Sequence, residues 1–165
     1  MMRKARHIVQ LWQSLGLGRV PTRDRLKIYN FPALQPHLFV AEVAKRIEDY
    51  RFVLAGSAVE KSYGAELTGL TFGELDLGPA KSQIMEEYEL CAQKREAIAS
   101  CHQMRVGDDG VIELQRVLLP FDAPNKEGVA QVVGWFHLAP ALKRAVKGSV
   151  SRWTTAEREF IRASD

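Results

Sequence analysis

The spacing of apolar residues predicts a helix at the start of the chain. In residues 3–16 apolar side chains recur at intervals of one, three and four positions, which is the period of an amphipathic helix. This helix is expected to end near Gly16 or Gly18. Three prolines between residues 21 and 36 then disfavour a continuing helix. The segment after residue 18 is therefore predicted to be an irregular cover over the core, with at most one short helix.

Residues 50–59 alternate in the manner of a β-strand, with Phe52, Leu54, Gly56 and Ala58 on one face. Glycines then break the chain into short pieces as far as residue 73. A long helix is predicted over residues 80–100, because its apolar residues share one stripe. That stripe holds Ile84, Tyr88, Cys91 and Ile98, and the charged residues expected to face away from it are Glu86, Glu87, Lys94, Arg95 and Glu96.

After this helix the pattern has a period of two. Residues 101–106 and 111–120 are predicted to form a hairpin around Asp109 and Gly110. A second turn within residues 121–128 leads to a strand over 129–138, which places Phe136 on an apolar face and Trp135 and His137 on the other. Thr154 and Glu157 have the spacing of a capping box, so a short helix is expected in the basic tail.

This order of elements is typical of an α+β domain, with antiparallel strands and helices gathered on one side. The chain of 165 residues is expected to hold one such domain. No run of 18 apolar residues occurs, and the basic start lacks a continuous apolar segment, so neither a membrane span nor a secretory signal is expected. Cys91 and Cys101 are interpreted as reduced thiols of a cytoplasmic protein.

Five stretches resemble the PAS domain family, more particularly its stand-alone proteobacterial subfamily. The most specific is YGAELTGLTFGEL (63–75), in which a Tyr-Gly pair and a GxELTG turn follow a strand; the others are LWQSL with GRVPTR (11–23), PHLFVAEV (36–43), YRFVLAGS (50–57) and VVGWFHL (132–138). The resemblance implies a five-stranded antiparallel sheet in the order 2-1-5-4-3 with helices on one face. The expected organisation is an N-terminal helix and covering segment (1–45), a PAS core (46–139) and a basic C-terminal tail (140–165).

The motifs of the sequence do not indicate a catalytic site or a cofactor site. Gly64, Gly69 and Gly73 have neither the dinucleotide-binding spacing nor that of a P-loop. His37, His102 and His137 are candidate haem or metal ligands, but haem is disfavoured because the predicted long helix contains no histidine. No metal site is expected, and any other cofactor is unknown. Adjacent residues on a helix diverge by about 100°, so Glu86 and Glu87 are not expected to act together as acid and base.

Arg116 lies on a predicted strand between Leu114 and Leu118, on the face expected to meet the core. A buried guanidinium requires an acid, a carbonyl or a ligand anion as its partner. Alternatively, a bulge shifts the register and the side chain extends to solvent. The sequence leaves both possibilities open.

The chain is therefore predicted to be a non-catalytic bacterial sensory or regulatory signalling module that binds an unknown small ligand or a protein partner such as a kinase. The predicted ligand-binding residues are Phe52, Leu54, Tyr63, Phe72, Ile84, Tyr88, Arg116 and Phe136. A homodimer is expected through Leu11, Trp12 and Leu15, whose alternative role is packing on the sheet of their own chain. A small pocket enzyme of isomerase or cyclase type is one alternative function.

The other alternative rests on charge. Residues 1–30 hold seven Lys and Arg against one acidic residue, and residues 140–165 hold six against three. Basic ends of this kind permit weak contact with nucleic acid phosphates, but no recognition motif accompanies them. Specific nucleic-acid binding is not expected.

Overall fold

A six-stranded antiparallel sheet organises the part of the chain that the computed structural model describes, which is residues 3–108, 110–140, 142 and 145–165. The spatial order is β2-β1-β5-β4-β3-β6. The strands are β1 (Leu38–Glu42), β2 (Arg51–Ala55), β3 (Ala97–Val106), β4 (Val111–Ala123), β5 (Lys126–Ala139) and β6 (Val150–Ile161). The order 2-1-5-4-3 implied by the family resemblance is confirmed, and β6 extends it beside β3.

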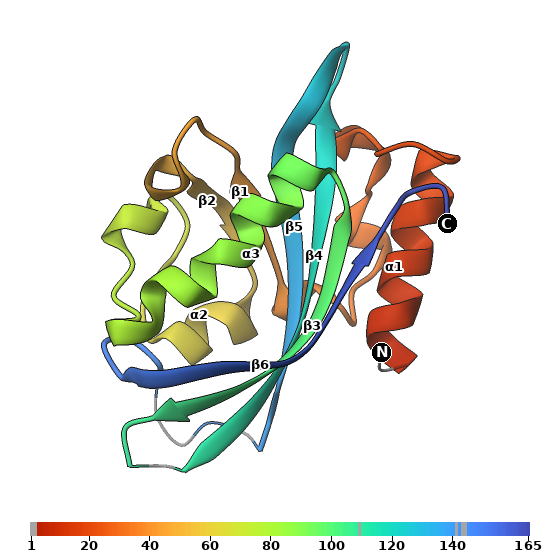
Figure 1. Cartoon of the computed structure of the whole chain (residues 1–165). Coiled ribbons are helices and arrows are strands. Elements are labelled where there is room, and N and C mark those ends of the chain that lie inside the picture. Colours follow the sequence, from red (N-terminus) through yellow and green to blue (C-terminus); the bar gives the residue numbers. More distant parts are fainter. Residues whose placement is uncertain (1–2, 109, 141, 143–144) are drawn as a thin grey trace.

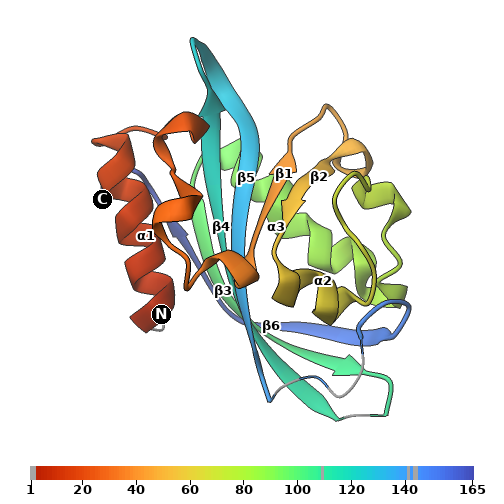
Figure 2. The same cartoon turned by 180° about the vertical axis from the view of Figure 1, so that it is seen from behind.

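Helices cover both faces of this sheet (Figures 1 and 2). The α-helices are α1 (Arg3–Gly16), α2 (Ser57–Tyr63) and α3 (Lys81–Lys94). The 3-10 turns are Arg23–Arg25, Ile28–Asn30, Gln35–His37, Ile47–Asp49, Phe72–Glu74 and Gly78–Ala80. We call the face covered by α2 and α3 the front face and the face covered by α1 the back face.

Each face carries its own hydrophobic cluster. The alternation of β4 shows this most simply, because Leu114 and Leu118 belong to the front cluster whereas Val117 and Leu119 belong to the back cluster. In β5, Phe136 packs toward the front cluster and Trp135 toward the back cluster, as the sequence pattern predicted. The sheet is therefore the middle layer between two apolar layers.

β1 corrects the expected irregular cover. Its first four residues are all buried, and the strand pairs with β2 on one side and β5 on the other. A short strand buried on both faces has no alternating pattern, so periodicity does not separate it from loop. The prolines before it mark its start and do not exclude it.

The expected C-terminal helix is wrong, because this segment forms β6. It pairs with β3 from Val150 to Ile161, and Trp153 and Ile161 are buried. Thr154 and Thr155 are β-branched residues, which favour strands. Pairing with β3 therefore overrides the local capping-box signal between Thr154 and Glu157.

Three further boundaries differ from the prediction. The strand predicted over residues 50–59 ends at Ala55, and Ala58 lies in α2. The long helix ends at Lys94, because Arg95 takes a left-handed conformation with φ 57°, and Ile98 lies in β3. The turn between β4 and β5 is shorter than predicted and consists of Pro124 and Asn125. Of the predicted Asp109–Gly110 turn, Asp109 lies outside the described residues.

Gly134 of β5 makes room for the ring of Phe39, because a Cβ built at Gly134 would overlap that ring. We expect Gly134→Ala to lower the free energy of unfolding by about 1–3 kcal/mol, the usual cost of overpacking a core. Urea denaturation measures the change in the free energy of unfolding. The double variant Gly134→Ala with Phe39→Leu should lose less stability than the sum of its single variants. A Gly134→Ala protein as stable as the wild type would contradict this packing.

Candidate functional site

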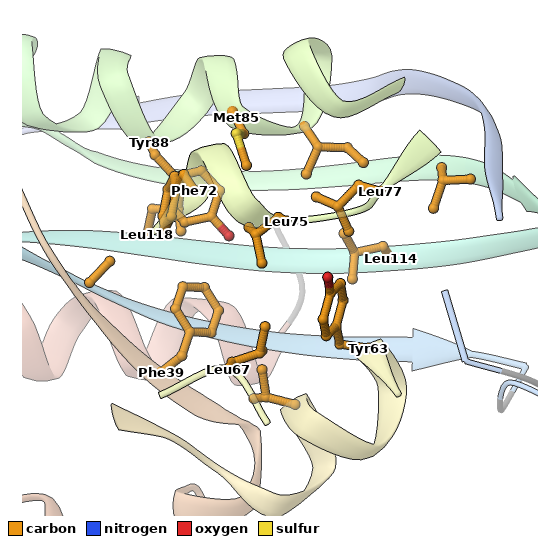
Figure 3. Close-up of a cluster of buried hydrophobic side chains, with 14 of the residues drawn as sticks. Phe39, Tyr63, Leu67, Phe72, Leu75, Leu77, Met85, Tyr88, Leu114 and Leu118 are labelled. Carbon is orange, nitrogen blue, oxygen red and sulfur yellow. The ribbon is translucent and has the colours of Figure 1, made fainter. Parts of the chain in front are cut away.

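A cavity of about 130 Å³ lies on the front face, between the sheet, α2 and α3. Figure 3 shows side chains of this region, with Tyr63, Leu114 and Phe39 among those directed into the space between the sheet and the helices. An apolar cavity of about 150 Å³ accepts a molecule the size of benzene. This cavity therefore accommodates a ligand about the size of benzene.

Six of the eight predicted ligand-binding residues line this cavity: Phe52, Tyr63, Ile84, Tyr88, Arg116 and Phe136. The structure brings them together from β2, α2, α3, β4 and β5. Their role in binding stays a prediction. Phe72 is fully buried, with its ring 4.9 Å from those of Phe52 and Tyr88, so it supports the lining from behind.

Leu54 does not line the cavity, and 38% of its surface is exposed. The reason is a bulge in β2. Phe52 pairs with Ala41, but Leu54 pairs with Val40, so Val53 is an extra residue on β2. The bulge changes the phase of the alternation, and Leu54 shares the back face with Val40 instead of the front face with Phe52.

Several lining residues were missed by the sequence interpretation. They are Phe39, Val59, Ser62, Leu67, Leu77, Met104, Leu114, Leu138, Val146, Val150 and Trp153. Leu138 carries the signal that identified Phe136, since both lie on one face of the same strand. Trp153 and Val150 were hidden because their segment was interpreted as a helical tail.

A buried charge cluster adjoins the cavity through Arg116. Arg116 Nη2 donates to Glu87 Oε2 at 2.7 Å, and Arg158 Nε donates to Glu87 Oε1 at 2.7 Å. The Glu87 and Arg116 side chains are 0% and 3% exposed. Arg158 also reaches Glu86 Oε2 at 3.2 Å, at the exposed edge of the cluster. The carboxylate of Glu87 thus links α3 to β4 and β6.

Two polar residues of β3 complete the cluster. Ser100 Oγ donates to Glu87 Oε2 at 2.8 Å, and His102 Nε2 lies 2.9 Å from Ser100 Oγ and 3.3 Å from Glu87 Oε2. The imidazole Nδ1 lies 3.1 Å from Thr155 Oγ1, and the ring stacks on Trp153 with 4.3 Å between centroids. His102 is fully buried.

The cluster fixes the charge states of its members. Burial opposes ionisation of Glu87, but the Arg116 charge and the hydrogen bonds from His102 and Arg116 outweigh it, so the pKa of Glu87 lies well below its ordinary value. Burial lowers the pKa of His102, and the Glu87 contact only partly offsets this. Burial also works against the charged form of Arg116, but Tyr88 and Glu87 reverse it and raise its pKa. Glu87 and Arg116 are therefore charged, and His102 is neutral.

The expectation that Glu87 faces away from the core is wrong. Its side chain is 0% exposed and is surrounded by four polar side chains from β3, β4 and β6. Such partners permit a carboxylate to be buried. For Arg116, the structure decides between the two alternatives. The pairing of β4 runs without a bulge at this residue, and Arg116 finds an acid inside the protein.

Two buried donors of the cavity lining have no partner within the described part of the chain. They are Arg116 Nε and Trp153 Nε1. Leaving a buried donor unsatisfied costs about 1–3 kcal/mol. The two side chains also touch, since Arg116 Cζ lies 5.3 Å from the centroid of the Trp153 ring. Both residues line the cavity.

The candidate haem and metal ligands do not converge. Among the residues described, no three His, Cys, Asp or Glu side chains come together as a metal site. His102 belongs to the charge cluster, whereas the His137 ring stacks against Trp135 at 6.4 Å between centroids. The cavity is also far smaller than a porphyrin macrocycle.

Trp12, a residue of the predicted dimer interface, packs on the sheet of its own chain. It is 1% exposed and packs in the back cluster, where its Nε1 donates to the carbonyl oxygen of Pro120 at 2.8 Å. Leu11 and Leu15 are half-buried against the same cluster. The alternative role of these residues, packing on their own chain, holds for Trp12. The oligomeric state itself stays a prediction.

A family model described as the PAS domain matches residues 1–136. The chain belongs to the PAS domain family. PAS domains are sensory or regulatory modules, and many mediate protein interactions. No curated protein matches the chain. Among the described residues, no helix is both long and apolar enough to cross a bilayer.

β6 and Trp153 lie outside the residues that the family model matches. Strands β1 to β4 lie wholly within residues 1–136, and β5 ends just after it. The PAS part of the chain thus supplies most of the cavity, whereas Val146, Val150 and Trp153 close it from the segment that follows.

We expect the stability of this PAS domain to fall as pH drops from 7 to 5. Because the pKa of His102 is lowered in the folded protein, the unfolded chain takes up a proton near its ordinary pKa of about 6.5 that the folded protein does not bind. The stabilising contribution is thus complete above that pH and lost below it. The lowered pKa of Glu87 also makes the stability fall as the pH drops, and this loss begins near pH 4.5, the ordinary pKa of a glutamate.

His102→Gln should flatten this dependence. Denaturation midpoints at pH 7, 6 and 5 measure it, with the exposed His7→Gln as the matched control. Partial burial also lowers the pKa of His37, which acts in the same direction, so some slope is expected to remain. An unchanged slope in His102→Gln would show that its burial is not coupled to folding.

Proposed function

We propose that this PAS domain is a non-catalytic sensory or regulatory module that holds a small, mostly apolar ligand in the front cavity. The observation that carries the proposal is the cavity itself, lined by side chains from both the PAS core and β6. Concave apolar sites with a few polar groups are the usual form of small-ligand sites. A ligand there touches α3 and the sheet at once, so its binding favours one packing of the two layers.

The charge cluster favours binding over catalysis. A general base must be able to take up a proton near the working pH. Glu87 is held ionised well below its ordinary pKa and already accepts from Arg116, Arg158 and Ser100. It also does not line the cavity. These properties argue against the isomerase or cyclase alternative, which needs one free acid in the pocket.

Strand β4 offers a route from the cavity to α1. Arg116 and Leu114 line the cavity, whereas the Pro120 carbonyl of the same strand accepts from Trp12 of α1. A change in the position of β4 at the cavity would therefore alter the packing of α1 on the back face. We propose that α1, with its exposed basic outer residues, transmits the bound state to a partner such as a second copy or a kinase.

Native mass spectrometry of the purified protein tests this proposal. Comparison of the native and denatured masses is expected to show a bound molecule about the size of benzene. The same spectrum reports whether the protein is a dimer. Leu138→Phe, which fills the cavity, should lose the bound species, whereas Leu17→Phe on the exposed surface should keep it. Retention of the bound species in Leu138→Phe would place it elsewhere.

A further inference from the structure

We propose that the ligand of the front cavity is a small branched or cyclic organic acid, whose carboxylate accepts hydrogen bonds from Arg116 Nε and Trp153 Nε1. This inference rests on the proposed function and adds the chemical class of the ligand. It follows from three properties of the cavity: its unpartnered donors, the charge beside them, and its size.

Two hydrogen-bond donors of the cavity lining have no partner among the described residues. Arg116 is held on several sides, because Nη2 donates to Glu87 and its guanidinium lies over the rings of Tyr88 and Trp153, at 5.0 and 5.3 Å from their centroids. Its Nε is buried and has no partner among the described residues, and neither has Trp153 Nε1. Both groups only donate, so a ligand that satisfies them must present acceptor oxygens.

The local charge selects an acid over a neutral acceptor. Arg116 and Arg158 both contact Glu87, so two guanidinium groups share one buried carboxylate. Arg158 leans toward Glu86, but that side chain is 57% exposed and its charge is screened by solvent. His102 packs against Trp153 in its neutral form. The described cluster thus retains positive charge, which favours an anion and disfavours an amine.

The rest of the lining limits the body of the ligand. Around the two donors the cavity is lined by apolar and aromatic side chains such as Phe52, Ile84 and Met104. A volume of about 130 Å³ leaves room for a carboxylate with four or so further carbon atoms. Trp153 lies outside the residues that the family model matches, so the family match alone does not predict this donor.

Three molecules of one shape test the proposal: 3-methylbutanoate, 3-methylbutanamide and 3-methylbutylamine. Each is titrated at pH 7 into 15N-labelled protein, and the indole N–H signals of Trp12, Trp135 and Trp153 are followed by NMR, with Trp153→Phe assigning the third. The acid should shift the Trp153 signal downfield, because its indole gains a hydrogen bond. The Trp12 signal, whose donor already serves Pro120, is the internal control. The amide should bind at least tenfold more weakly than the acid, and the amine should not bind.

Trp153→Phe separates the hydrogen bond from packing, since phenylalanine keeps a ring against His102 but lacks the donor. We expect it to weaken 3-methylbutanoate about tenfold, within the range for a hydrogen bond to a charged group, and to leave the binding of toluene within about twofold, because no hydrogen bond is involved. Trp135→Phe on the back face is the matched control and should change neither.

Equal affinity for the acid and the amide, or an acid that binds without moving the Trp153 signal, overturns this inference. Binding of toluene without any binding of 3-methylbutanoate also overturns it, but leaves the proposed function standing. If toluene and the acid both fail to bind, the proposed function fails as well. The two failures are therefore distinguishable in one set of titrations.

Discussion

Glu87→Gln is expected to lower the free energy of unfolding by about 3–5 kcal/mol, the usual cost of removing one partner from a buried ion pair. The substitution keeps the shape of the side chain but removes its charge. Arg116, with a side chain only 3% exposed, is then left without a counter-charge, and Arg158 loses its inner partner. Guanidinium denaturation followed by circular dichroism measures the change.

The adjacent residue provides the matched control. Glu86 makes its contact with Arg158 at the exposed edge of the cluster, so Glu86→Gln should cost at most about 1 kcal/mol. Replacement of both buried partners, as Glu87→Leu with Arg116→Met, should recover much of the loss, because no fully buried charge is left unpaired and the partly exposed Arg158 keeps its contact with Glu86. If Glu87→Gln and Glu86→Gln were equally mild, the buried charge cluster would not be a structural feature of the folded protein.

Trp12→Ala should be comparably destabilising, by about 3–5 kcal/mol. The indole is 1% exposed, it fills the back cluster beneath α1, and it satisfies the buried carbonyl of Pro120. Thermal and urea denaturation of the variant measure the loss. Trp12→Phe keeps most of the apolar contact and should lose less, mainly the hydrogen bond.

Leu17→Ala is the control for this helix end. Leu17 is 80% exposed, so its substitution should change stability by no more than about 0.5 kcal/mol. A Trp12→Ala protein as stable as the wild type would mean that α1 does not pack on the sheet in solution. Trp12 would then be available to a partner surface, as the sequence interpretation first suggested.

The sequence predicted the sheet order and six of the residues that line the cavity, for physical reasons that can be identified. The strands of the central hairpin alternate cleanly, so the opposed faces of Phe136 and Trp135 followed from periodicity. Arg116 stood out because a charge on a core face requires a partner. The order of the strands came from the family resemblance, since periodicity does not specify which strands become neighbours.

The misses have local causes. One extra residue, Val53, reverses the face of Leu54, and a bulge leaves no trace in a pattern of apolar residues. β6 was missed because a capping-box spacing competed with β-branched residues, and only pairing with β3 decides between them. Glu87 was assigned to solvent because helical position alone does not reveal partners on β4 and β6.

The most direct test of a ligand site on the front face is a titration of methyl-labelled protein with toluene, followed by methyl NMR. We expect the signals of Met104, Leu114 and Val150, which line the cavity, to shift as it fills. The signals of Val117, Leu119 and Val133, in the back cluster of the same sheet, should stay unchanged. Saturating toluene that moves neither group, or moves both alike, would contradict a ligand cavity between α3 and the sheet.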